Sequence, residues 1–227
     1  SLPFAVFLKF LHGERTSLFK DDQIKLFLLI LITIIITSTI WLNLNFFDNN
    51  FIYSLRLSAF NITSILTGTG YTSTDYNTWG SFGLVIMILI MFIGGCAGST
   101  TGGIKIFRLQ LLFRGSKTQI KRLTKPHGVF LTSFNGRSVT DETFNSIMVF
   151  FFIYILIFIF ASIALSFYNL DFITSFSAAA SAISNVGPGL GSIIGPNSNY
   201  NQLPEGAKWI LSVTMLVGRL ELFTFLV

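Results

Sequence analysis

Two long apolar runs constrain this sequence more than any other feature. Residues 26–47 and 143–168 are rich in Leu, Ile and Phe, and residues 150–160 of the second run are almost unbroken. A helix of about 20 apolar residues crosses the roughly 30 Å hydrocarbon core of a bilayer. Both runs are long enough for this, so we predict two membrane-spanning helices.

The composition excludes several other classes of protein. Charged residues make up only 11% of the chain and hydrophobic residues 52%, whereas a soluble domain carries about 25% charged residues. A single cysteine, Cys96, rules out an internal disulfide framework. The two histidines, His12 and His127, lie far apart and form no recognisable metal site. The spans hold no paired carboxylates and no nucleophile–histidine set, so we expect no enzyme.

The basic residues gather in two of the connecting regions. They lie before the first run and over residues 105–137, whereas the other two connections hold only Arg56 and Lys208. Because cytoplasmic loops collect Lys and Arg, we expect the N-terminus and 105–137 to face the cytoplasm. Regions 48–80 and 169–208 then face outside. The basic cluster lacks the aromatic interleaving of a nucleic-acid site, so we predict no nucleic-acid partner.

One layout occurs twice along the chain: a span, a short outer loop, a half-length apolar segment, a glycine-bearing turn and a second span. The half-length segments are 54–66 and 172–184, each too short to cross a bilayer. Such a helix enters a membrane only where protein surrounds it. Gly70 of the first turn pairs with Gly187, 117 residues later. The turns consist of Thr67, Gly68, Thr69, Gly70, Tyr71 and Thr72, and of Asn185, Val186, Gly187, Pro188, Gly189, Leu190 and Gly191.

Glycine-bearing turns of this kind suit a dehydrated potassium ion. Backbone carbonyls can replace its water shell where glycine allows the required dihedral angles. The run Thr69-Gly70-Tyr71 resembles the Val-Gly-Tyr core of potassium-channel filters. A short helix whose C-terminal end points at the ion adds a partial negative charge. Ordinary outer loops are the alternative, and two copies in register argue against it. Asp75 and Asp171 lie outside the turns, where they serve at most to attract cations.

A glycine-rich break interrupts the apolar segment that begins at residue 81. Residues 81–93 are too short to cross a bilayer, and helical character resumes at 104–113. The break is either a flexible segment, with Ser and Thr side chains satisfying the freed backbone groups, or a site of close helix packing through small residues. It lacks the Lys placement of a Walker A loop. Its residues are Gly94, Gly95, Cys96, Ala97, Gly98, Ser99, Thr100, Thr101, Gly102 and Gly103.

The last apolar run, 207–227, contains Arg219 near its middle. An intramembrane arginine usually faces a cavity or a partner. Glu221 is two positions on, which places it on another helix face. The chain starts without Met and stops inside this run, so we expect a fragment of a longer protein.

Three motifs resemble the signatures of the Trk/Ktr potassium-uptake membrane subunits, and the TrkH type most of all. The first is Ile93 to Thr100 with Gly102-Gly103-Ile104-Lys105, the second is Asn185 to Gly191 followed by Gly195-Pro196, and the third is Met215 to Glu221. They match in order, and the resemblance covers essentially the whole chain. It implies a fold of four helix–pore-helix–helix repeats around one pore, of which this chain resembles the third and fourth.

The expected fold is therefore an all-α membrane protein with two potassium-channel-like repeats, re-entrant loops and a broken second helix. We expect a cytoplasmic segment (1–23), a first repeat (24–115), a cytoplasmic basic linker (116–140) and a second, C-terminally truncated repeat (141–227). By resemblance, carbonyls of residues 67–71 and 185–189 bind potassium, and the loop 94–103 gates the pore below them. Arg219 projects toward that pore, an ion pair with another helix being the alternative. Lys105 and Arg108 are expected to be interface anchors.

The resemblance implies potassium uptake, as a channel or symport, in a multi-pass protein of the bacterial cytoplasmic (inner) membrane. Potassium is the transported ion, and no cofactor is expected. The implied partners are the lipid bilayer, a cytoplasmic nucleotide-binding regulatory subunit of the TrkA type and a second copy of the full-length protein. Two alternatives remain open: a two-repeat channel that dimerises to complete its own pore, and a structural membrane subunit that conducts no ions.

Overall fold

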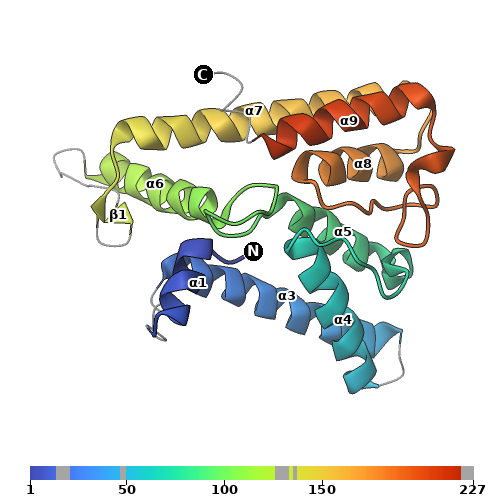
Figure 1. Ribbon diagram of the computed structural model, residues 1–227, viewed down its shortest axis with the longest axis horizontal. Helices are drawn as coiled ribbons and strands as arrows, with labels where there is room; N and C mark the ends of the chain where they lie inside the picture. The colour runs from blue at the N-terminus through green and yellow to red at the C-terminus, as the bar shows by residue number, and fades with distance from the viewer. Residues whose placement is uncertain (14–20, 47–49, 126–132, 135–136, 221–227) are drawn as a thin grey trace.

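The computed structural model describes residues 1–13, 21–46, 50–125, 133–134 and 137–220, and their regular secondary structure is almost entirely helical (Figure 1). Two-residue strands form a small antiparallel hairpin, β1 (Ser133–Phe134) with β2 (Arg137–Ser138). The helices are α1 (Phe4–Leu11), α3 (Asp22–Asn45), α4 (Phe51–Leu66), α5 (Gly80–Phe92), α6 (Ile106–Thr124), α7 (Asp141–Ser166), α8 (Phe172–Ser184) and α9 (Glu205–Arg219), with 3-10 turns η1 (Tyr76–Trp79) and η2 (Tyr200–Gln202).

The two predicted spans form the longest helices, α3 and α7. Each begins earlier than its apolar run because a polar residue caps it. Asp21 accepts a hydrogen bond from Gln23 N at 2.8 Å, and Thr140 accepts one from Thr143 N at 3.3 Å. Both helices are long and apolar enough to cross a membrane, and only 22% and 28% of their most apolar windows are buried. Phe47, the last residue of the first predicted run, lies outside the described residues.

The half-length segments form helices α4 and α8. Helix α8 spans the predicted residues, and α4 begins three residues earlier than predicted, where Asn50 caps it. Asp171 caps α8 and Asp75 caps η1, so both aspartates have a local structural role. Helix α8 is buried along most of its length, because α7, α9 and α5 pack around it. This is the enclosure that a helix ending at membrane depth requires.

Helix α6 extends well beyond the predicted segment 104–113. The basic residues between 116 and 124 are therefore helical. Helix α6 runs from the glycine-rich break toward the β hairpin (Figure 1). Helix α6 packs on α7 at Gly115, where a Cβ atom would lie 2.0 Å from the Phe144 ring. Arg15, Lys20, His127 and the end of the last predicted run, 221–227 with Glu221, lie outside the described residues.

Candidate functional site

The turns after α4 and α8 have the same backbone conformation at paired positions. Gly68 and Asn185 have φ angles of 66° and 55°, and Gly70 and Gly187 have φ angles of 78° and 112°. Each pair is separated by 117 residues, the offset predicted from the glycines alone. Asn tolerates the left-handed region better than most residues, which lets it take the place that glycine occupies in the first turn.

The helix ends hold the two turns in the same way. The amide of Thr69 donates to Ser64 O at 2.9 Å, and the paired amide of Val186 donates to Ser181 O at 3.0 Å. Donors and acceptors are again 117 residues apart. The repeat therefore extends from sequence layout to individual hydrogen bonds, so both turns are folded by the same local interactions.

The two turns touch each other across the molecule. A Cβ atom on Gly70 would lie 2.4 Å from Val186 O and 3.2 Å from Pro188 Cδ. Gly70 also needs its positive φ, so two independent constraints require glycine there. The backbones of the two turns are thus in direct contact at Gly70.

The glycine-rich break between α5 and α6 is a closed loop, which Figure 1 shows in green near the middle of the long axis. Its two ends pair through backbone hydrogen bonds at the neck. Gly94 N donates to Ile104 O at 2.8 Å, Ile104 N to Phe92 O at 2.9 Å, and Ile106 N to Gly95 O at 3.0 Å. We call residues 94–103 the glycine loop.

Side chains inside the glycine loop satisfy its free backbone groups, as predicted for Ser99 and Thr101. Ser99 Oγ donates to Cys96 O at 2.6 Å, and Gly95 N donates to Thr101 Oγ1 at 2.9 Å. The alternative of helix packing through small residues is wrong, because this segment is not helical. A Cβ atom on Gly98 would meet nothing within 4 Å, so no neighbour requires a glycine there through close packing.

The glycine loop lies against the bases of both turns. A Cβ atom on Gly102 would lie 2.1 Å from Ser184 O, the residue that precedes the second turn. Thr101 Cγ2 lies 3.8 Å from the Cβ position of Gly68 in the first turn. The structure therefore brings together the three segments that the sequence singled out: two turns and one loop.

Residues from distant segments also hold the second turn, and the sequence did not indicate two of them, Asn77 and Tyr200. Tyr200 OH donates to Gly187 O at 2.7 Å. The Asn77 side chain makes two hydrogen bonds to the backbone of Gly191, accepting from its amide at 3.0 Å and donating to its carbonyl at 3.2 Å. Asn185 Nδ2 donates to the backbone oxygen of Met215 on α9 at 3.1 Å. No local pattern marks Asn77 or Tyr200, because their partners are 114 and 13 positions away.

Two cationic side chains bind consecutive carbonyls of the glycine loop. Arg219 Nη1 donates to Thr100 O at 2.7 Å. Lys105 Nζ donates to Ser99 O at 2.9 Å and also to Thr101 O. Lys105 is only 5% exposed. The expectation that Lys105 is an interface anchor is therefore wrong, because its ammonium is buried against the loop.

The same two cationic side chains line a cavity of about 190 Å³ beside the glycine loop. Its walls are Ser99, Thr100, Thr101, Gly102, Gly103, Lys105, Phe150, Tyr154, Gly218 and Arg219. The guanidinium of Arg108 lies outside this lining and stacks over the Phe150 ring, 3.8 Å from its centroid. Arg108 therefore contributes to packing between α6 and α7.

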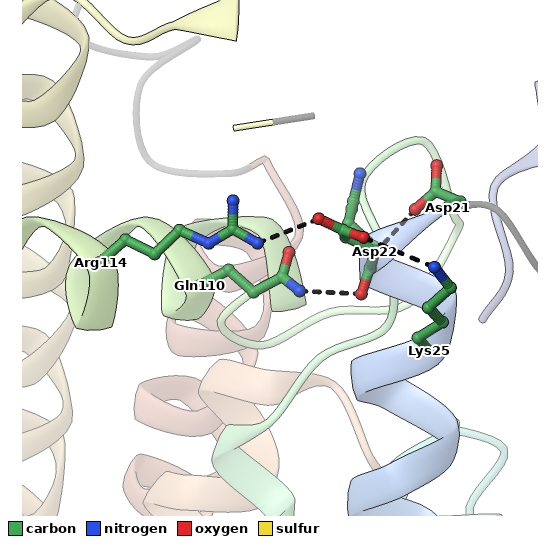
Figure 2. Close-up of polar contacts among 6 residues, drawn as sticks. Asp21, Asp22, Lys25, Gln110 and Arg114 are labelled. Atoms are coloured by element: carbon green, nitrogen blue, oxygen red, sulfur yellow. Dashed lines mark hydrogen bonds and ion pairs between the residues drawn. The ribbon is translucent and has the colours of Figure 1, made fainter. Parts of the chain in front are cut away.

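A second polar cluster joins α6 to the start of α3 (Figure 2). Arg114 Nη2 pairs with Asp22 Oδ2 at 3.0 Å, and Gln110 Nε2 donates to Asp22 O at 2.8 Å. The neighbouring Gln23 accepts a hydrogen bond from Ala97 N at 2.9 Å. Helix α3 therefore contacts both α6 and the glycine loop.

The two turns offer backbone carbonyl oxygens, and not charged side chains, as ligands for an ion. Within the described ranges, no group of three or more His, Cys, Asp or Glu residues could hold a metal ion. The turns instead offer uncharged carbonyls at the C-terminal ends of two half-length helices. Such oxygens suit an alkali cation that must bind and then leave.

Comparison with known proteins agrees with these observations. The family model TrkH, described as a cation transport protein, matches residues 7–227. The Trk system potassium uptake protein TrkI of Halomonas elongata is 41% identical over 100% of this chain and 46% of its own length. TrkG of Escherichia coli, a protein of the same description, is 35% identical over 92% of this chain and 42% of its own length.

The fold matches a solved structure as well. The crystal structure of the potassium transporter TrkH from Vibrio parahaemolyticus aligns with a TM-score of 0.90 at 31% identity. The alignment covers 99% of this chain and 48% of that one. The chain thus spans about half the length of the curated relatives it matches. Sequence and fold together place it plainly: the chain belongs to the TrkH family of cation transport proteins.

Proposed function

We propose that this chain forms two helix–pore-helix–helix repeats of a protein that takes up potassium across the bacterial cytoplasmic membrane. One observation carries the proposal: the turns after α4 and α8 repeat each other in backbone angles and hydrogen bonds, and they touch. The relatives named as potassium uptake proteins support the choice of ion. The repeats correspond to residues 24–115 and 141–227, with 116–140 on the cytoplasmic side. The first residues of the expected cytoplasmic segment 1–23 lie instead at the first turn and the glycine loop, where Ser1 Oγ donates to Thr67 O at 3.3 Å and Phe4 N donates to Gly98 O at 3.3 Å.

In this proposal the turns supply part of a potassium filter. Carbonyls of residues 67–71 and 185–189 replace the water shell of the ion, and two further repeats of the full-length protein complete the ring. The C-terminal ends of α4 and α8 add partial negative charge at the turns. The hydroxyl of Tyr200 holds one of these carbonyls, Gly187 O, in a fixed orientation.

The apolar surface supports placement in a membrane. Four residues of α3 that share one face are between 49% and 63% exposed: Leu29, Ile32, Ile36 and Ile40. Exposing such side chains to water costs about 25 cal/mol for each Å². Lipid, or the remaining repeats, covers this face. The basic residues of α6 place this end of the protein on the cytoplasmic side of the membrane. They also give a docking surface for a TrkA-type regulatory subunit. The full-length protein forms a homodimer.

The glycine loop acts as the gate in this proposal. It lies directly against the bases of the turns, where an ion leaving the filter has to pass. Its Ser and Thr side chains satisfy part of its own backbone, so these hydrogen bonds can move with the loop. The Arg219 guanidinium places a positive charge beside that path, which raises the barrier to cations.

A flux assay on the full-length parent protein tests the proposal. Purified protein in liposomes, loaded with potassium or sodium on one side, should carry potassium in preference to sodium. A structural membrane subunit carries neither ion, and that result would sink the proposal. A self-contained two-repeat channel predicts equal flux from this half alone. The partial coverage of the relatives favours four repeats in one chain.

A further inference from the structure

We propose that Lys105 is a positioning residue that latches the glycine loop in place beneath the two turns. Its ammonium donates to the carbonyls of Ser99 and Thr101, two positions apart on the loop. The inference rests on the proposed function in one respect, namely that the loop gates an ion path. That Lys105 holds the loop in place does not depend on whether the protein transports potassium.

Helix formation does not explain a lysine at this position. Lys105 is the N-cap residue of α6, and its side chain makes no capping hydrogen bond to the helix. Helix N-termini favour Ser, Thr, Asp or Asn at the cap and disfavour positive charge, because the helix dipole is positive there. Burial adds the desolvation of an ammonium. The loop carbonyls offset these two unfavourable effects, so the contact is what makes the placement tolerable.

Arg219 holds the glycine loop as well, and the two cationic side chains bind alternate carbonyls. Lys105 binds Ser99 O and Thr101 O, while Arg219 binds the intervening Thr100 O. Lys105 precedes α6 in the first repeat, and Arg219 ends α9 in the second. If the loop withdrew, two positive charges lining one cavity would lose these acceptors. The contacts therefore favour the seated loop.

The test is Lys105→Met in the full-length protein, which removes the ammonium and keeps an unbranched apolar side chain. Each hydrogen bond to a charged group that is lost shifts an equilibrium by about tenfold or more. Lys105→Met removes two such bonds, so we expect the loop to leave its seat at least tenfold more often. Potassium uptake in the absence of regulatory activation should rise, whereas a merely misfolded protein would lose uptake.

Cys96 gives a readout that does not depend on ion flux. It lies in the glycine loop, is 0% exposed and is the single cysteine of this chain. With any cysteines elsewhere in the parent protein changed to Ser, a small methanethiosulfonate reagent should label Cys96 at least tenfold faster in Lys105→Met. The matched control is Lys117→Met, which removes the same charge from an exposed position on α6 and should leave labelling unchanged.

Unchanged Cys96 labelling in folded Lys105→Met overturns the latch, whatever happens to uptake. Faster labelling in a parent protein that carries no potassium keeps the latch and rejects the proposed function. If Lys105→Met does not fold, Lys105→Gln replaces it, because its uncharged amide is too short to bridge both carbonyls. The same labelling criterion then applies, so either variant decides the proposal.

Discussion

Replacing Gly70 by Ala tests the contact between the two turns. The new Cβ would lie 2.4 Å from Val186 O, so that carbonyl or Gly70 itself must move by about 1 Å to reach van der Waals distance. The positive φ of 78° adds about 1–2 kcal/mol of backbone strain for any residue with a Cβ atom. The strain affects stability, whereas the displacement changes the geometry of both turns.

The two effects can be separated with a control. Gly13→Ala has a comparable positive φ of 100°, but its Cβ would meet nothing within 4 Å. In cells that depend on the full-length protein for potassium, Gly70→Ala should reduce uptake by about tenfold or more, because a shift of about 1 Å in a binding geometry is that costly. Gly13→Ala should stay within about twofold. Normal uptake and normal potassium preference in Gly70→Ala would refute the filter assignment.

Three further changes have distinct expected outcomes. Tyr200→Phe removes the hydroxyl that holds the second turn, worth about 1 kcal/mol, so the ratio of potassium to sodium flux in liposomes should fall a few-fold with folding intact. Asp22→Asn breaks a partly exposed ion pair with Arg114, so the midpoint of thermal unfolding should fall by no more than about 2 °C. Gly102→Ala brings a Cβ within 2.1 Å of Ser184 O and should displace the glycine loop, raising Cys96 labelling; unchanged labelling would show that the loop tolerates the contact.

Local patterns were enough to predict most of the helices. Helix α8 spans the predicted residues, and α5 begins and ends one residue before the predicted 81–93. Most errors are at helix ends, where capping residues decide: Asp21 and Asn50 start α3 and α4 earlier than hydrophobicity alone indicates. The short helix α1 was not predicted at all. Helix α6 was predicted too short because its second half is basic, and hydrophobicity marks only its apolar first half.

The sequence likewise predicted some parts of the candidate site and missed others. The paired turns and the glycine loop were predicted because glycine positions and a 117-residue repeat are visible in one dimension. The partners of the turns were not. Asn77 and Tyr200 act on residues 114 and 13 positions away, and each looks like an ordinary loop residue in the sequence. Lys105 was assigned to the membrane interface because a lysine beside an apolar segment usually lies there.

By itself, the sequence determined the helix types, their order, the repeat and the kind of backbone that the turns require. These depend on hydrophobic length and on glycine dihedrals, which are properties of neighbouring residues. Only the tertiary structure decided that the turns touch, that the loop lies against them and that Lys105 and Arg219 bind consecutive loop carbonyls. Whether a buried charge is tolerable depends on oxygens that distant segments bring to it, and no local pattern contains that information.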